Sequence, residues 1–201
     1  GENPIDIQRC TACMDAIIFG NASIKSAFDM ALYDIAAQQA RLPLYRYLGG
    51  SRQKMLYTDY TVSLSDPSAM ASAAKEIMLK GFPVIKVKLG AGMGQDVDSI
   101  RQIRAAVGMD IPIRIDANQA WSIDEAIQIL KALEPYRIQH CEAPIRKGQF
   151  AALANIRRNS PIPIMADESC CTPFDAEQLI QFQSCDSINI KLGKSAGLFA
   201  A

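Results

Sequence analysis

Charged residues recur at nearly even intervals through the last three quarters of the chain, each at the end of a short run of apolar and β-branched residues. Five of them are separated by 28, 26, 25 and 24 positions, namely Lys88, Asp116, Glu142, Asp167 and Lys191. The stretches between the runs are amphipathic and carry helix signals, such as Asp66-Pro67 at a start. Strands that alternate with helices predict βα units and a parallel sheet. An even repeat of about 25 residues is typical of a (β/α) barrel.

We expect six strands and five intervening helices after residue 50. Eight βα units of this size need roughly 200 residues, whereas the whole chain has 201 and its first 50 are of a different kind. The predicted fold class is therefore α/β, a partial TIM-like (β/α) barrel of about six units over residues 51–201, apparently truncated. The strands are expected at 55–64, 84–89, 111–117, 138–142, 162–166 and 187–192, and the helices at 68–80, 96–107, 122–133, 150–158 and 173–183.

The first 50 residues contain helical patterns without strands. Apolar residues at helical spacing predict a helix over 23–40, with Ile24, Phe28 and Ile35 on one face. A second, short helix is expected to start near Leu42-Pro43-Leu44 and to end at Gly49-Gly50. We interpret residues 1–50 as the C-terminal part of a separate domain whose beginning lies outside this chain.

Composition excludes several classes of partner. The 21 basic and 21 acidic residues cancel, so no electrostatic footprint for nucleic acid or for an acidic membrane is expected. Apolar runs such as 111–115 fall far short of the ~20 residues that a membrane span needs. The N-terminus has no signal-peptide layout, so we expect a cytoplasmic protein. Six cysteines are too sparse for a disulfide scaffold, and Cys10 and Cys13 are expected to pack rather than to bind zinc.

Three carboxylates end consecutive predicted strands. In a (β/α) barrel the C-terminal ends of the strands converge on one mouth, so Asp116, Glu142 and Asp167 are expected to meet there. Crowded anions are costly unless a cation lies among them, and a set of oxygen ligands suits Mg²⁺. The alternative is that one or more of these acids caps the helix that follows it.

Lysines form the second half of the predicted site. Lys86 and Lys88 are two residues apart and therefore point to the same side of the sheet, and Lys191 ends the sixth strand, opposite the second in a ring of eight. A lysine can act as a base when burial, a neighbouring positive charge or a divalent cation favours loss of its proton. If a bound anion has one base on each face, one base can remove a proton and the other can return a proton from the opposite face. The carbon centre is then inverted. The alternative is that the lysines form structural salt bridges with the acids.

Weaker signals come from polar residues next to these charges. Asn118, Asn189 and Glu168 are expected to support the ligands or the lysines from behind, and Thr61 to contact substrate. His140, the single histidine, is expected to be packed or solvated rather than to act as a ligand or base.

In order and register, these motifs resemble the enolase superfamily, specifically its mandelate racemase/muconate lactonising enzyme subgroup. Residues 28–50 are similar to the helical end of that family's α+β capping domain, and residues 58–63 (TDYTVS) resemble the dipeptide epimerases that act on Ala-Glu and related dipeptides. The matching motifs are IKVK at 85–88, DANQ at 116–119, CEAP at 141–144, ADES at 166–169 and NIK at 189–191.

The resemblance implies a Mg²⁺-dependent epimerase, an isomerase that inverts an α-carbon next to a carboxylate through an enolate by proton transfer with two bases. The substrate would be a small molecule, a dipeptide or another carboxylate. Formation of a homo-oligomer stays open. The roles implied are metal ligands Asp116, Glu142 and Asp167, acid/base catalysts Lys88 and Lys191, and substrate contacts Lys86 and Thr61.

Other functions remain open at this point. The same machinery serves cycloisomerases and lyases of the superfamily, as in muconate lactonisation or o-succinylbenzoate synthesis, and racemases of N-acylated amino acids. A truncated barrel that binds metal or assembles with itself without catalysis is the alternative from another class. The start of the capping domain and strands seven and eight, which in the family close over the substrate and bind the amino group of a dipeptide, are expected to lie outside this chain.

Overall fold

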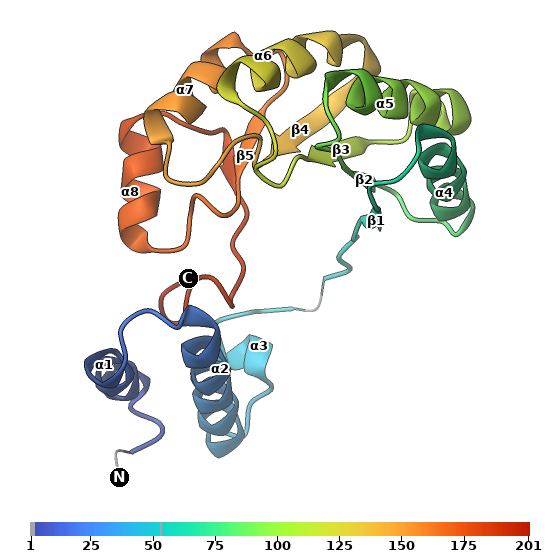
Figure 1. Ribbon diagram of the computed structural model, residues 1–201. Helices are drawn as coiled ribbons and strands as arrows, with labels where there is room; N and C mark the ends of the chain where they lie inside the picture. The colour runs from blue at the N-terminus through green and yellow to red at the C-terminus, as the bar shows by residue number, and fades with distance from the viewer. Residues whose placement is uncertain (1–2, 53) are drawn as a thin grey trace. The chain divides into compact units, whose positions relative to one another are not determined.

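The computed structural model describes residues 3–52 and 54–201, and in that part of the chain six short parallel strands form one sheet. Neighbours in the chain are neighbours in the sheet, as the colour order in Figure 1 shows. This arrangement confirms the predicted partial (β/α) barrel. The strands are β1 (Tyr60–Val62), β2 (Ile85–Lys88), β3 (Ile113–Asp116), β4 (Ile138–Glu142), β5 (Ile164–Ala166) and β6 (Ser187–Ile188).

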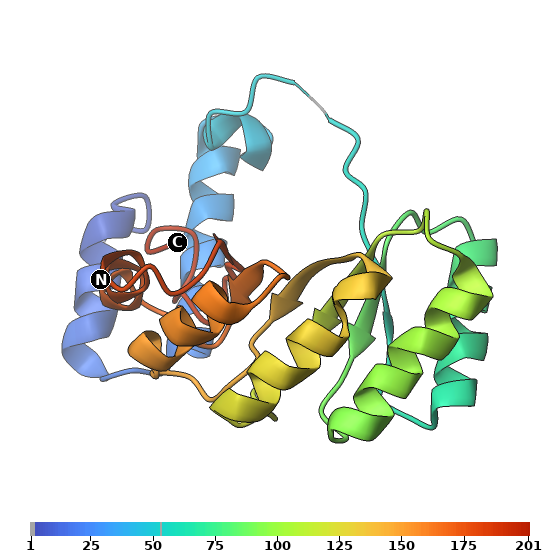
Figure 2. The ribbon, with the colours of Figure 1, turned by 90° about the horizontal axis from the view of Figure 1, so that it is seen from above.

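The helices between the strands cover one face of the sheet (Figure 2). Asp66 caps α4 by accepting a bond from the Ala69 amide, and Ser122 and Glu125 form a reciprocal capping box on α6. These two helices therefore start where the sequence carries an oxygen acceptor for the first amides, whereas α5 and α7 begin after Gly92 and Gln149 without a side-chain cap. The helices are α4 (Pro67–Leu79), α5 (Met93–Val107), α6 (Ile123–Ala132), the 3₁₀ turn η1 (Glu134–Tyr136), α7 (Phe150–Asn159) and α8 (Pro173–Gln181).

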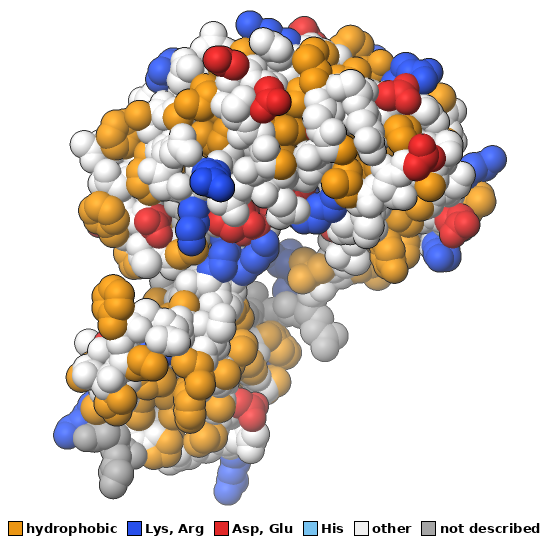
Figure 3. Space-filling model, viewed as in Figure 1, with side chains coloured by type: hydrophobic (Ala, Val, Ile, Leu, Met, Phe, Trp, Pro, Cys, Tyr) orange, Lys and Arg blue, Asp and Glu red, His pale blue; other side chains and the backbone are white. Residues whose placement is uncertain are grey.

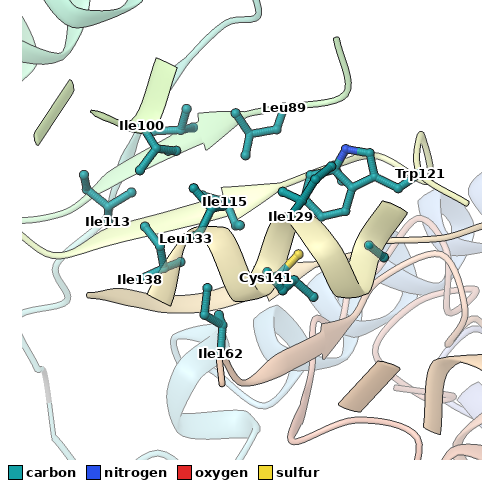
Figure 4. Close-up of a cluster of buried hydrophobic side chains, with 14 of the residues drawn as sticks. Leu89, Ile100, Ile113, Ile115, Trp121, Ile129, Leu133, Ile138, Cys141 and Ile162 are labelled. Carbon is teal, nitrogen blue, oxygen red and sulfur yellow. The ribbon is translucent and has the colours of Figure 1, made fainter. Parts of the chain in front are cut away.

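The hydrophobic core lies between this face of the sheet and the helices. Along β2 and β3 the residues alternate, so Ile85, Val87, Ile113 and Ile115 are fully buried against the helices while the lysines of β2 point to the other face. Isoleucine and leucine from the helices complete the layer (Figure 4). The opposite face of the sheet is left for polar side chains. The helical members include Ile100, Ile103, Ile129, Leu130, Leu133 and Ile156.

The outer strands are shorter than the sequence predicted. β1 begins at Tyr60 rather than at residue 55, and β6 ends at Ile188 rather than at residue 192. Each of them has one neighbour in the described sheet, so the extra residues find no second ladder of hydrogen bonds. Met55 and Leu56 are 80% and 86% exposed, as expected for residues outside the strand.

Chain contacts divide the molecule into two units. The helical unit runs to Met55 and also includes Cys171–Phe174 and Ile190–Ala201, and the barrel unit comprises Leu56–Cys170 and Asp175–Asn189. The division near residue 55 lies close to the domain boundary expected after residue 50. That residues 190–201 group with the helical unit was not anticipated, because the sequence pattern there continues that of the sixth strand.

The helical unit contains α1 (Ile7–Ile17), α2 (Ala22–Gln39) and α3 (Leu44–Tyr47). The sequence predicted α2 and α3 but missed α1, whose start is marked by Asp6 accepting a bond from the Arg9 amide. No helix in the described ranges is long and apolar enough to cross a membrane.

The apolar face of α2 is not its buried face. Ile24 and Phe28 are 55% and 60% exposed, whereas Lys25 and Asp29 are buried. Lys25 pairs with Asp15 at 2.7 Å, and Asp29 Oδ2 accepts a bond from the Leu198 amide, whereas Asp29 Oδ1 has no hydrogen-bond partner among the described residues. Apolar side chains consequently cover much of the visible surface of this unit (Figure 3). The helix that periodicity predicted is confirmed, and its apolar face is exposed in the described part of the chain.

Arg104 on α5 joins the loops at the N-terminal end of the sheet. Its side chain is 5% exposed, and its guanidinium donates to four backbone carbonyls. Two of these carbonyls precede β3 and two precede β4, so one side chain fixes the loops that lead into both strands. The carbonyls belong to Gly108, Ile111, Tyr136 and Arg137.

Replacing Arg104 by methionine should lower the free energy of unfolding by about 3 kcal/mol, because buried carbonyls lose their donor. Arg101→Met on the same helix is the control, since that side chain is 59% exposed and pairs with Asp98 on the helix surface, and it should cost no more than about 0.5 kcal/mol. Urea unfolding followed by the fluorescence of Trp121, the single tryptophan, measures both. Equal losses for the two variants would contradict the role of Arg104.

Candidate functional site

The C-terminal ends of β2, β3 and β4 bring three charged residues into one row. Lys88, Asp116 and Glu142 are the last residues of these strands, as the sequence predicted. The Cα atoms of Lys88 and Asp116 are partners in the ladder, and so are those of Asp116 and Glu142. The register therefore places a cation and two carboxylates side by side at one end of the sheet.

Lys86 bridges the two carboxylates of this row. Its Nζ donates to Glu142 Oε2 at 2.5 Å and lies 2.9 Å from Asp116 Oδ2. The side chains of Asp116 and Glu142 are 1% and 3% exposed, and that of Lys86 is 16% exposed. Buried carboxylates are costly without a partner of opposite charge, and Lys86 supplies it.

Lys88 is held from two sides. Its Nζ donates to Asp116 Oδ2 at 2.8 Å and to Asn118 Oδ1 at 2.5 Å. The Asn118 amide in turn donates to Asp116 Oδ1, and Asn118 has a positive φ of 45°. The turn after β3 therefore adopts a left-handed conformation that directs an amide oxygen to the lysine.

Glu142 also accepts a hydrogen bond from a residue that follows β6. Asn189, the first residue after β6, donates from Nδ2 to Glu142 Oε1 at 2.9 Å. Asp167 follows the last residue of β5 and is 1% exposed, and Glu168 is half-buried. Thr61 on β1 is half-buried and is the ladder partner of Lys86. Asn189 thus contacts the cluster through Glu142, and Thr61 adjoins it as the ladder partner of Lys86. The predicted roles of Asp167 and Glu168 stay predictions.

The charges of the cluster reinforce one another. Burial would raise the pKa of Asp116, but hydrogen bonds from Lys88 and Lys86 and from the Asn118 amide lower it below its ordinary value. Burial would lower the pKa of Lys86, but its bonds to Glu142 and Asp116 outweigh burial and raise this pKa. Asp116 is therefore ionised and Lys86 protonated at neutral pH.

Within residues 3–52 and 54–201 no three His, Cys, Asp or Glu side chains are gathered in a metal-binding arrangement. The ammonium of Lys86 lies between two of the predicted ligands, Asp116 and Glu142, and forms an ion pair with each of them. The donor set nevertheless fits a hard cation, since buried carboxylates follow three neighbouring parallel strands and include Asp167. The metal site stays a prediction.

The predicted second base is Lys191. It follows the end of β6 by a short segment, its side chain is exposed, and it belongs to the helical unit rather than to the barrel unit. Its predicted place across the substrate from Lys88 therefore stays a prediction.

A group of polar side chains formed by Arg114, Gln139 and Asp59 was not predicted from the sequence. Arg114 on β3 donates from Nε to Gln139 Oε1 at 3.0 Å and from Nη1 to Asp59 Oδ2 at 2.9 Å. Arg114 precedes Asp116 by two residues, so strand alternation was the signal that would have found it. His140 beside this group is half-buried, and burial, together with Arg114 and Lys86, lowers its pKa. His140 is therefore neutral at pH 7, in line with its expected packing role.

Comparison with known proteins adds family relationships to this geometry. Residues 69–201 match the sequence profile described as "Enolase C-terminal domain-like", and residues 1–49 match that of "Mandelate racemase / muconate lactonizing enzyme, N-terminal domain". Together these profiles cover most of the chain.

Several of the similar proteins are epimerases. The chain is 56% identical over 198 residues to a D-Ala-D/L-Ala epimerase of Cytophaga hutchinsonii, which covers 98% of this chain and 54% of that protein. It is 42% identical over 188 residues to an L-Ala-D/L-Glu epimerase of Bacillus subtilis, covering 92% and 51%. The chain thus spans about half the length of these relatives.

The fold agrees with a solved structure of the same kind. A crystal structure of the dipeptide epimerase from Cytophaga hutchinsonii, complexed with Mg and the dipeptide D-Ala-L-Val, superposes with a TM-score of 0.97 at 56% identity. The match covers 100% of this chain and 54% of that one. That protein binds both a metal and a dipeptide.

Removing the bridging ammonium should destabilise the barrel unit. Lys86→Met leaves two buried carboxylates with less compensation, and we expect a loss of about 3 kcal/mol in the free energy of unfolding. Lys88→Met is the matched control on the same strand, because its side chain is 31% exposed, and it should cost about 1 kcal/mol. Urea unfolding at pH 7 measures both. A larger loss for Lys88→Met would contradict the bridging role of Lys86.

Proposed function

The chain belongs to the mandelate racemase/muconate lactonizing enzyme family of the enolase superfamily, and from that premise we propose that the protein is a Mg²⁺-dependent dipeptide epimerase. The observation that carries the proposal is the pair of lysines on β2, Lys86 and Lys88, in contact with a carboxylate that ends the next strand. A lysine held in place beside buried acids can act as a general base or acid toward the carbon atom next to a bound carboxylate. The 56% identity to a D-Ala-D/L-Ala epimerase supports the substrate class.

Asp116, Glu142 and Asp167 would hold the metal. Their oxygen atoms are the ligands that Mg²⁺ prefers, and all three side chains are buried at the C-terminal ends of neighbouring strands. A bound Mg²⁺ would fix the substrate carboxylate and stabilise the negative charge that develops when the α-proton leaves. Asn189 would orient Glu142 through the amide bond to Oε1.

The lysines would carry the proton. Lys88 Nζ is directed by Asp116 and Asn118, and in its neutral form it would take the α-proton of one stereoisomer. Lys191 would return a proton from the opposite face, so that the α-carbon is inverted. Lys86 keeps a positive charge because its pKa is raised, and it would bind the substrate carboxylate together with Thr61.

The proposed Mg²⁺ site is tested by calorimetric titration of the natural polypeptide with Mg²⁺. Glu142→Gln should abolish the binding signal, because the variant removes one charged ligand from a hard cation. Glu125→Gln is the control, since this exposed residue lies in the capping box of α6 and glutamine preserves that box. Unchanged Mg²⁺ affinity in Glu142→Gln would exclude the site.

The proposed two-base reaction is tested in D₂O with an Ala-Glu or Ala-Ala dipeptide. Solvent deuterium should appear at the α-carbon of the epimerised product. Lys88→Ala and Lys191→Ala should each slow epimerisation by about 10²-fold to 10⁴-fold, as removal of a general base does. Either variant should still exchange the α-proton of one stereoisomer through the remaining lysine.

Lys131→Ala on the exposed surface of α6 is the control and should retain the wild-type rate. Full epimerisation by Lys191→Ala would refute the assignment of two bases. A chemical product other than the stereoisomer would favour a lyase or cycloisomerase of the same superfamily.

A further inference from the structure

Asp96 is a fully buried carboxylate in the first turn of α5. The sequence predicted that this helix begins at Asp96, but it begins at Met93, and the side chain of Asp96 is 0% exposed. A buried carboxylate is costly unless hydrogen bonds satisfy its oxygens. Those bonds come from the amides of Gly90 and Ala91 and from Trp121 Nε1.

The donors to Asp96 belong to two different turns. The Gly90 amide lies 3.0 and 3.1 Å from the two carboxylate oxygens, and the Ala91 amide lies 3.0 Å from Oδ1. These residues form the turn that begins one residue after Lys88. Trp121 Nε1 lies 2.9 Å from Oδ2 and belongs to the turn that carries Asn118. Lys88 directly precedes the first turn, Asn118 lies in the second, and the two side chains are hydrogen-bonded to each other. Asp96 therefore connects the two segments that carry the partners of this bond.

The two turns are in close contact. Gly90 has a φ of +123°, and a Cβ atom on it would lie 2.7 Å from the Cβ of Ala120. The Leu89 amide donates to the carbonyl of Asp116 at 3.0 Å. A displacement of either turn would thus be transmitted to the other, and with it to Lys88.

The second turn is also conformationally demanding. Asn118 and Gln119 both have positive φ, 45° and 68°, a conformation that costs free energy in residues other than glycine. It is held from the other side as well, since the Gln119 amide donates to the Ala143 carbonyl and the Trp121 amide to the Pro144 carbonyl. A strained turn keeps its shape only while its neighbours fix it, and Asp96 fixes the end at Trp121.

We propose that Asp96 is a positioning residue, which sets the place of Lys88 Nζ relative to Asn118 and Asp116 by binding both turns. The proposal deepens the function proposed above and rests on it for the role of Lys88. Asp96 itself is enclosed in the protein and acts through the backbone of the first turn and the indole of the second. Figure 4 shows the Trp121 side chain among the buried hydrophobic side chains of the core, which hold the indole in place.

The test compares three variants of the natural polypeptide. Asp96→Asn keeps the shape of the side chain but replaces one acceptor by a donor, so that at least one N–H group, the Ala91 amide or the Trp121 indole, loses its partner. Trp121→Phe removes a single hydrogen bond and retains an aromatic ring in the core. Arg104→Lys is the control, since it weakens a buried network at the opposite end of the sheet.

The first readout is independent of catalysis. Acetylation of Lys88 by acetic anhydride, quantified by mass spectrometry against Lys131 in the same molecule, reports how firmly its Nζ is held. We expect labelling to rise in Asp96→Asn, to rise less in Trp121→Phe, and to stay at the wild-type level in Arg104→Lys. Unchanged labelling of Lys88 in Asp96→Asn, with a melting temperature lowered as in the control, would overturn the proposal.

The second readout uses the dipeptide reaction. Misplacement of a reacting group by about 1 Å costs on the order of 10²-fold in rate, so kcat of Asp96→Asn should fall by 10-fold to 100-fold with a smaller change in KM. Wild-type kcat in this variant would overturn the proposal. If the wild-type protein has no epimerase activity, the proposed function fails, and the labelling of Lys88 alone decides the role of Asp96.

Discussion

The register of the parallel ladder is the constraint on which the site depends. Because Lys88, Asp116 and Glu142 are aligned across three neighbouring strands, their charges meet without any contribution from a long loop. Two lysines and two buried carboxylates then compensate one another on the face of the sheet that the helices leave uncovered. The apolar layer on the other face supplies the stability that allows this polar face to form.

Much of the barrel was predictable because its signals are periodic. Charges at intervals of 24 to 28 residues located the strand ends, and alternation placed Lys86 and Lys88 on one face. The shift of register between β3 and β4 was not predictable, because an extra residue in β4 leaves no mark in the hydrophobic pattern. The contact of Asp96 with Trp121 joins residues 25 positions apart, and only the fold brings such residues together.

The helical unit shows the limit of pattern reasoning. Helical periodicity located α2 and its apolar face but did not indicate which residues are buried, since Lys25 and Asp29 are buried while Ile24 and Phe28 are exposed. Periodicity reports which face is apolar, whereas burial depends on what the rest of the chain offers to that face. A buried charge paired within the unit carries no sign of its burial in the sequence.

The turns after β2, β3 and β4 share hydrogen bonds in series, from Gly90 and Ala91 through Asp96 and Trp121 to the carbonyls of residues 143 and 144. Their lengths are consequently linked. An insertion in one of them would shift the donors of the next, and substitutions within the series should be non-additive in their effects on stability. Evolutionary change in this part of the barrel would then have to proceed by coordinated replacements, with single steps limited to side chains that preserve every acceptor.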